Sequence, residues 1–243
     1  MFSTKVDMND KILIFDIWAD YAHFRKYSTT VSPLTFSIPP RTAICGLISA
    51  IIGLGKDQYL EHFSKKQANI AIKIISPIKT TRISHNLIDT ETASGMNLIK
   101  NRIQILFEYV KDVKYRIYFR HENTELYNKT KEFLENHKSV YTPCLGLSEN
   151  IANFCYIGER IYKEVIIEDF VKIDSVIPRP KDSLVDIDIE EEKEYDDELM
   201  PIVMNKDRIV EEYNNIYFER NGLPIIAKVN KFYEVGDERI LFL

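Results

Sequence analysis

Residues 37–55 read Ser-Ile-Pro-Pro-Arg-Thr-Ala-Ile-Cys-Gly-Leu-Ile-Ser-Ala-Ile-Ile-Gly-Leu-Gly, and the rest of the chain is arranged around this run. Proline has a fixed φ and no backbone N–H, so Pro39 and Pro40 must end any preceding strand. Proline is nevertheless tolerated in the first turn of a helix. The sequence therefore predicts a helix that begins near Arg41.

The predicted helix carries no charge from Ala43 to Leu54, and its small residues recur on one face: Ala43, Gly46, Ala50 and Gly53. Because glycine costs a helix about 1 kcal/mol relative to alanine, we expect this face to lie very close to a sheet. We interpret the helix body as buried core. The free amides at its start, beside Arg41 and Thr42, form a candidate phosphate site.

Composition indicates an ordinary globular chain without membrane spans. The 243 residues are 45% hydrophobic, which allows one large domain with a sizeable core. No run approaches the roughly 20 apolar residues that cross a bilayer, and the N-terminus does not resemble a signal peptide, so we expect a cytoplasmic protein. The three cysteines and five histidines lack metal-ligand spacing, so we expect reduced thiols, no metal and no cofactor.

Charge is distributed unevenly along the chain. Residues 1–140 hold 20 Lys and Arg against 14 Asp and Glu, a net charge of +6, whereas residues 141–243 hold 12 against 23, a net charge of −11. Ten acids fall within residues 182–198, where only Lys193 opposes them. A block of this kind is typical of a solvated, mobile loop.

A short aromatic and cationic segment follows the first predicted strand, Lys11–Asp20. It contains Phe24, Arg25, Lys26 and Tyr27. Aromatic faces stack on unpaired bases while Arg and Lys bind phosphates, so this composition suits single-stranded RNA. The alternative interpretation is a surface loop whose aromatic residues pack into the core.

The order of the predicted elements is strand, helix, strand, strand, helix, strand. After the first helix come a strand over 68–77, a polar excursion over 78–100, paired strands over 101–121 around a short turn at 111–114, a helix over 123–137 and a strand over 151–157. This order predicts an α+β, ferredoxin-like (βαββαβ, RRM-like) domain. We place it at 1–168, with an inserted β-hairpin at about 78–101 and a β-rich extension at 169–243 that contains the acidic loop.

Three stretches resemble the fifth family of CRISPR-associated proteins, whose members are RAMP-type subunits of type I Cascade. They are Phe-Arg-Lys-Tyr at 24–27, the run from Leu34 to Gly53, and Tyr-Thr-Pro-Cys-Leu-Gly-Leu-Ser-Glu-Asn-Ile-Ala at 141–152. The chain looks closest to the type I-B branch. The resemblance implies a non-enzymatic subunit that binds the 5′ handle of CRISPR RNA and caps the backbone filament beside the large subunit. A thumb-like hairpin, here 78–101, would reach the neighbouring backbone subunit.

The resemblance also implies a set of RNA contacts. Phosphates would bind Arg25, Lys26, and Arg41 with the helix amides near Thr42, and bases would stack on Phe24 and Tyr27. Gly146 would let a loop approach the RNA without a Cβ in the way. The hairpin's side of the groove would be lined by Arg82, His85, Lys100 and Arg102.

Two other functions stay open at this stage. In the type I-C branch, related proteins cleave precursor RNA without metal, using a tyrosine, a lysine and a histidine. Here Arg120 and His121 end a strand and Tyr27 or Tyr21 could supply the phenol, although arginine replaces the lysine. The third interpretation is a ferredoxin-like domain that binds a small molecule or has a regulatory role.

Overall fold

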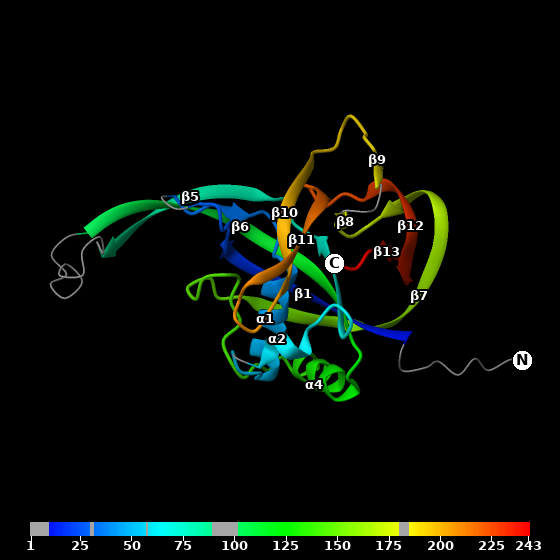
Figure 1. Ribbon diagram of the computed structural model, residues 1–243, viewed down its shortest axis with the longest axis horizontal. Helices are drawn as coiled ribbons and strands as arrows, with labels where there is room; N and C mark the ends of the chain where they lie inside the picture. The colour runs from blue at the N-terminus through cyan, green and yellow to red at the C-terminus, as the bar shows by residue number, and fades with distance from the viewer. Residues whose placement is uncertain (1–9, 30–31, 57, 89–101, 180–184) are drawn as a thin grey trace, which may run out of the picture.

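The computed structural model describes residues 10–29, 32–56, 58–88, 102–179 and 185–243. Its centre is a large antiparallel sheet with few helices, which confirms the predicted α+β class (Figure 1). The sheet runs in the order β13-β12-β7-β1-β6-β4, with β5 added on β6 and β9 on β12. Its strands are β1 (Lys11–Ala22), β4 (Ala68–Ile74), β5 (Lys79–Ile88), β6 (Arg102–His121), β7 (Asn153–Ile173), β9 (Asp186–Asp188), β12 (Ile225–Val235) and β13 (Glu238–Ile240).

Two smaller sheets and the helices complete the described chain. The first sheet, which we call the C-terminal sheet, has the order β10-β11-β8 and consists of β10 (Tyr195–Met204), β11 (Val210–Glu219) and β8 (Ile177–Arg179). The second is a short hairpin of β2 (Phe24–Arg25) and β3 (Thr35–Phe36). The helices are α1 (Arg41–Ile52), α2 (Tyr59–His62) and α4 (Thr124–Glu135), and they gather on one side of the large sheet (Figure 1). None of them is long and apolar enough to cross a membrane.

The central strand β1 is buried on both faces. Leu13, Phe15 and Ile17 join a core that also contains the apolar residues of α1 and α4. Ile12 and Ile14 point to the opposite face and join a second cluster with residues of β12 and β13. This is why the β1 sequence is a nearly continuous apolar run rather than an alternating one.

Helix α1 begins at Arg41 as predicted, but its small residues do not face the sheet. Its largest apolar residues are the buried ones, whereas Ala43, Gly46, Ala50 and Gly53 are half-buried. Residues 140 and 141 run along that side: their amides donate to the carbonyls of Ile51 and Ala50 at 3.0 Å. A Cβ at Gly53 would lie 2.7 Å from a methyl group of Val140. The small residues therefore leave room for the loop at residues 140–141 to pack against α1. The prediction that this face contacts the sheet was wrong.

Strand β6 is one continuous strand of 20 residues, so the turn predicted at 111–114 does not exist. Residues 102–111 pair with β5, and residues 110–119 pair with β1. The polar run Lys-Asp-Val-Lys therefore marks the place where β6 leaves the body of the protein. Beyond it, β5 and β6 form a two-stranded hairpin that extends away from the body (Figure 1). The second half of the predicted insertion, 89–101, lies outside the described residues.

The acidic block is folded where the structure describes it, over 185–198. Residues 186–188 form β9, which pairs with β12, and residues 195–198 begin β10. The Glu198 carboxylate is buried and accepts hydrogen bonds from the Ser37 amide (2.9 Å), the Ser37 hydroxyl (3.1 Å) and Lys26 (2.8 Å). The prediction of a mobile loop was wrong here because composition does not reveal which acids acquire buried partners.

The chain beyond residue 168 is continuous with the large sheet. β7 pairs with β1 over 153–161 and with β12 over 162–173, so one strand joins the two parts predicted from the sequence. Later residues return to the outer edge of β4: Val176 donates to the Ile72 carbonyl (2.8 Å) and Leu243 to the Ile70 carbonyl (2.9 Å). At the next outward carbonyl, Ile74, a Cβ on Gly222 would come within 2.4 Å.

Candidate nucleic-acid interface

The β2–β3 hairpin holds residues 24–29 and 32–36 against the base of the long β5–β6 hairpin. Phe24 pairs with Phe36, and both rings are buried. The Thr35 hydroxyl accepts from the Phe24 amide at 2.8 Å and donates to the Phe36 carbonyl at 2.9 Å. The Glu108 amide of β6 donates to the Pro33 carbonyl at 3.0 Å. These bonds fix the backbone from which the next side chains project.

The four predicted contacts at 24–27 separate into two kinds. Arg25 is exposed, and Tyr27 is 66% exposed, so both can reach a ligand. Phe24 is 4% exposed and belongs to the core, so it is not available for stacking on a base. Lys26 is bound to Glu198 and lies 5.5 Å from the centre of the Phe36 ring, and its side chain stays 29% exposed.

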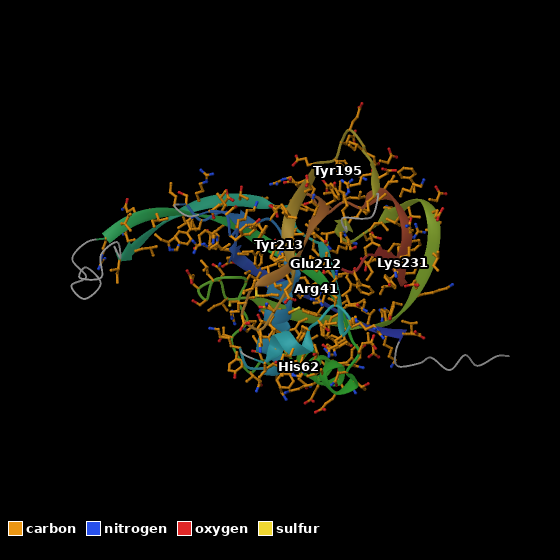
Figure 2. The ribbon with its side chains drawn as sticks, in the orientation of Figure 1. Arg41, His62, Tyr195, Glu212, Tyr213 and Lys231 are labelled. Carbon is orange, nitrogen blue, oxygen red and sulfur yellow. The ribbon has the colours of Figure 1, made fainter. Side chains whose placement is uncertain are left out.

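Arg41 is built into the fold and does not face solvent. Its side chain is 2% exposed, and Nη2 donates to the carbonyls of Phe63, Ser64 and Ala68 at 2.7–3.2 Å. Nη1 donates to the Ile202 carbonyl of β10 at 3.4 Å, and the residue lies where β10 crosses the start of α1 (Figure 2). The expected phosphate contact of this guanidinium is corrected, because the side chain is buried and both Nη groups already donate to backbone carbonyls.

Thr42 lines a hollow of about 300 Å³ at the start of α1. Lys206 also lines it, but so do the carboxylates of Glu61 and Glu211. Arg41 lines it as well, so two cations are balanced by two carboxylates, and a lining without net positive charge does not favour a phosphate. The helix start is therefore the weakest part of the predicted set.

The hairpin presents two different faces. Arg82 pairs with Glu108 across the hairpin and contacts it at 3.7 Å, with 64% of the arginine side chain exposed. Arg102 pairs with Ile88 and, by the two-residue alternation of strands, lies on the same face as Arg82. Glu108 also lies 3.5 Å from the Thr35 amide, so this face adjoins the β2–β3 hairpin. The structure thus places Arg82 and Arg102 on the hairpin face that adjoins Thr35, the residue paired with Arg25.

His85 lies on the opposite face, in an aromatic cluster that sequence reasoning missed. Its Nε2 lies 2.7 Å from the Tyr109 hydroxyl, and the two rings are stacked with centres 5.7 Å apart. His23 and Phe107 add rings within 5.5 Å of this pair. His85 therefore braces the hairpin base and does not line a groove with Arg82. Lys100 lies outside the described residues.

Gly146 lies against the backbone of His23, directly before the β2–β3 hairpin. It has φ +90°, and a Cβ there would lie 1.8 Å from the His23 carbonyl oxygen. The His23 amide donates to the Leu145 carbonyl at 3.1 Å. The glycine is needed for contact with the chain's own backbone, so the expectation that it admits RNA is corrected. Nδ1 of buried His23 bonds to the Glu108 carbonyl at 2.6 Å, and burial lowers the pKa of this ring.

The three residues of the cleavage alternative do not form a site. Both ring nitrogens of His121 are engaged: Nε2 donates to the His62 carbonyl (2.7 Å) and Nδ1 accepts from the Asn123 amide (2.9 Å). Burial lowers its pKa and keeps it neutral, and Arg120 is buried beside Glu122. Tyr27 belongs to the segment that follows β1, and the end of β1 pairs with residue 110 of β6. His121 lies eleven residues further along β6, which corresponds to about 36 Å.

Among the described residues, no cluster of His, Cys, Asp and Glu side chains could hold a metal ion.

Comparison with known families gives one match. The family described as CRISPR-associated protein (Cas_Cas5) matches residues 12–206, which is most of the chain. No curated protein sequence matches it.

Solved structures share the fold at low sequence identity. A CRISPR protein from Archaeoglobus fulgidus has a TM-score of 0.53 at 14% identity, covering 95% of this chain and 98% of its own. A chain of a CRISPR RNA-guided surveillance complex has a TM-score of 0.52 at 11% identity, covering 88% and 91%. A chain of a type III-B Cmr-beta complex bound to cognate target RNA has a TM-score of 0.51 at 12% identity, covering 89% and 86%. The described architecture is therefore one already seen among CRISPR proteins.

Proposed function

The chain belongs to the Cas5 family of CRISPR-associated proteins, and from this premise we propose that it is a non-catalytic subunit of a type I-B Cascade complex. In this role it binds the 5′ handle of CRISPR RNA and caps the backbone filament, with the backbone subunit and the large subunit as its neighbours. Two chains with the same fold are recorded in a CRISPR RNA-guided surveillance complex and in a complex bound to RNA, which supports an assembly role.

One observation carries the RNA-binding proposal. Arg25 and Tyr27 are exposed beside the base of the long hairpin, and Arg82 and Arg102 continue the cationic surface along its neighbouring face. Guanidinium groups bind phosphates bidentately, and an exposed tyrosine ring can stack on an unpaired base. We call these four residues the candidate interface. Arg25 contacts the Thr29 carbonyl at 3.5 Å and Arg82 contacts Glu108 at 3.7 Å, yet both side chains stay exposed to a ligand.

The proposed architecture is a ferredoxin-like domain with a thumb. The central strands in the order β7-β1-β6-β4, with α1 and α4 on one face, support a βαββαβ domain. The hairpin of β5 and the outer half of β6 supports the thumb placed at 78–101. We retain 1–168 as the first domain and 169–243 as the extension, joined through β7.

The test is binding of purified protein to a short 5′-handle RNA and to a scrambled RNA in EDTA, with a salt series. We expect preference for the handle, and affinity that falls with salt as expected for several phosphate contacts. The double variant Arg25→Ala/Arg82→Ala should weaken binding, whereas Lys163→Ala, an exposed cation on β7, should not. Equal binding by the double variant would place the interface elsewhere. A gel of the RNA afterwards separates binding from cleavage, and a discrete cut would replace the cap role with processing.

A further inference from the structure

The C-terminal sheet has one buried and one outward face. Residues 198, 200 and 202 of β10 and 214, 216 and 218 of β11 are buried, and they pack toward the main core or the start of α1. The alternate residues face outward: Leu199 is 47% exposed, and Tyr213 and Tyr217 are half-buried. This outward face thus carries aromatic rings although it comes from the acidic half of the chain.

The outward face meets the candidate interface at two tyrosines. The ring centres of Tyr27 and Tyr213 lie 5.5 Å apart, tilted by 53°. Tyr213 lies on β11 beside Glu212 (Figure 2). Tyr27 is 66% exposed, so this ring pair, which we call the notch, is accessible to solvent and is not part of the core. Aromatic rings in such an arrangement accept the flat face of a third ring.

Charge around the notch favours RNA over a basic protein. Arg25 lies two residues from Tyr27, and Lys26 lies between them. Two nearby carboxylates already have cations: Glu198 binds Lys26 at 2.8 Å, and Glu212 binds Lys65 at 2.7 Å, whereas Glu211 is exposed and makes no ion pair with the described residues. A base on the rings would therefore have the Arg25 guanidinium nearby for its phosphate, and the paired carboxylates of Glu198 and Glu212 would oppose it less than free ones.

We propose that Tyr213 and Tyr27 form one base-stacking subsite, so that the C-terminal sheet contributes directly to RNA binding. Glu198 acts as a positioning residue in this subsite, because its bonds to Lys26 and Ser37 tie β10 to both ends of the segment that carries Tyr27. The inference rests on the proposed RNA-binding function and adds to it a residue from outside the predicted domain.

The test compares three single variants on the same handle RNA. Tyr213→Leu should lower affinity about tenfold, the range measured when one stacking ring is removed. Tyr213→Phe keeps the ring and should bind like the wild type. Tyr141→Leu removes a tyrosine that is 53% exposed beside α1 and is not part of the ring pair, and it should also bind like the wild type.

Photocross-linking tests whether the RNA contacts the two tyrosine rings directly, which a purely structural role of Tyr213 would not produce. Handle RNAs carrying 5-bromouracil at single positions are irradiated with the wild-type protein, and the attached residue is identified by mass spectrometry. We expect one position to cross-link to Tyr27 or Tyr213, and Tyr213→Leu to reduce that cross-link at saturating RNA.

Failures of the two proposals are distinguishable. If the wild type binds no RNA, the proposed function falls and the subsite with it. If the wild type and Tyr213→Leu bind RNA equally and no cross-link forms at either ring, only the subsite is overturned. If Tyr213→Leu instead weakens association with a purified neighbouring subunit, the notch is a protein contact.

Discussion

The β2–β3 hairpin and the start of α1 carry the same signal in the sequence and have opposite fates in the structure. Each places an arginine beside apolar residues, Arg25 in one and Arg41 in the other. Arg25 is exposed, whereas Arg41 is 2% exposed with four carbonyls around its guanidinium. Three of those carbonyls belong to residues 63–68 and the fourth to Ile202 of β10, so the segment after α2 and the C-terminal sheet together cover the helix start and leave Arg25 exposed. An arginine's role therefore depends on which part of the chain returns to cover it.

The sharpest way to break this comparison is to remove each arginine in turn. Arg41→Ala leaves several buried carbonyls without donors, so we expect it to lower the free energy of unfolding by about 3 kcal/mol or more. Arg25→Ala should change it by less than about 0.5 kcal/mol, as is usual for an exposed side chain. Urea unfolding followed by the fluorescence of Trp18, the chain's single tryptophan, measures both. Equal losses would contradict the division between buried and exposed arginines.

A second substitution tests the support beneath the β2–β3 hairpin. Gly146→Ala would place a Cβ 1.8 Å from the His23 carbonyl at φ +90°, so the backbone must shift, and we expect a loss of about 3 kcal/mol. Gly236→Ala is the control, because Gly236 also has positive φ (+63°) but has no atom within 4 Å of the added Cβ. It should cost about 1 kcal/mol. A smaller loss for Gly146→Ala than for Gly236→Ala would remove the proposed support.

Glu198 links the β2–β3 hairpin segment to the start of α1, and substituting it tests that link. It binds Lys26 in the hairpin segment and Ser37 just before α1. Glu198→Gln keeps the size of the side chain but loses the charge, and we expect a loss of about 1–2 kcal/mol in urea unfolding. In a double-mutant cycle with Lys26→Met, the losses should be less than additive. Strict additivity would show that the ion pair contributes nothing to the link.

The smallest expected effect is a change in the free energy of unfolding with pH. Burial lowers the pKa of His23, below the β2–β3 hairpin, and of His121, beside the start of α4, so the folded protein holds both rings neutral. Their contribution is fully present above the unfolded-state pKa of about 6.5 and is lost as pH falls below it. We expect the free energy of unfolding to decrease from pH 7 to pH 5. His121→Gln should flatten part of this decrease, and an unchanged slope would contradict the role given to that ring.

The local elements of the fold were predictable because they depend on nearby residues. The start of α1 follows from Pro39 and Pro40, and β1 follows from its apolar run. The helix predicted over 123–137 is α4, capped by the Asn123 side chain at the amides of Glu125 and Leu126. The turn expected inside β6 was wrong because a polar run in a long strand has the composition of a turn, and only its pairing partners decide.

The candidate site was predictable only in part, because exposure is a property of the whole fold. The segment 24–27 was found by composition, but the sequence does not tell that Phe24 is buried while Tyr27 is not. Tyr213 and Glu198 had no signal at all, since Glu198 lies in the acidic block that was interpreted as a solvated loop and Tyr213 lies beyond it. Long-range contacts of this kind, across about 170–190 residues, leave no spacing pattern to detect.

The hydrogen bonds that later residues make to the outer edge of β4 also limit how this protein can associate. An edge strand with unpaired carbonyls is a template on which a strand of another molecule can add, and many proteins aggregate by that route. Here the carbonyls of Ile70 and Ile72 are already occupied by the chain's own amides, and Gly222 closes on Ile74. A neighbouring molecule at this edge would meet side chains and not an open ladder, so growth into a continuous intermolecular sheet is blocked along β4.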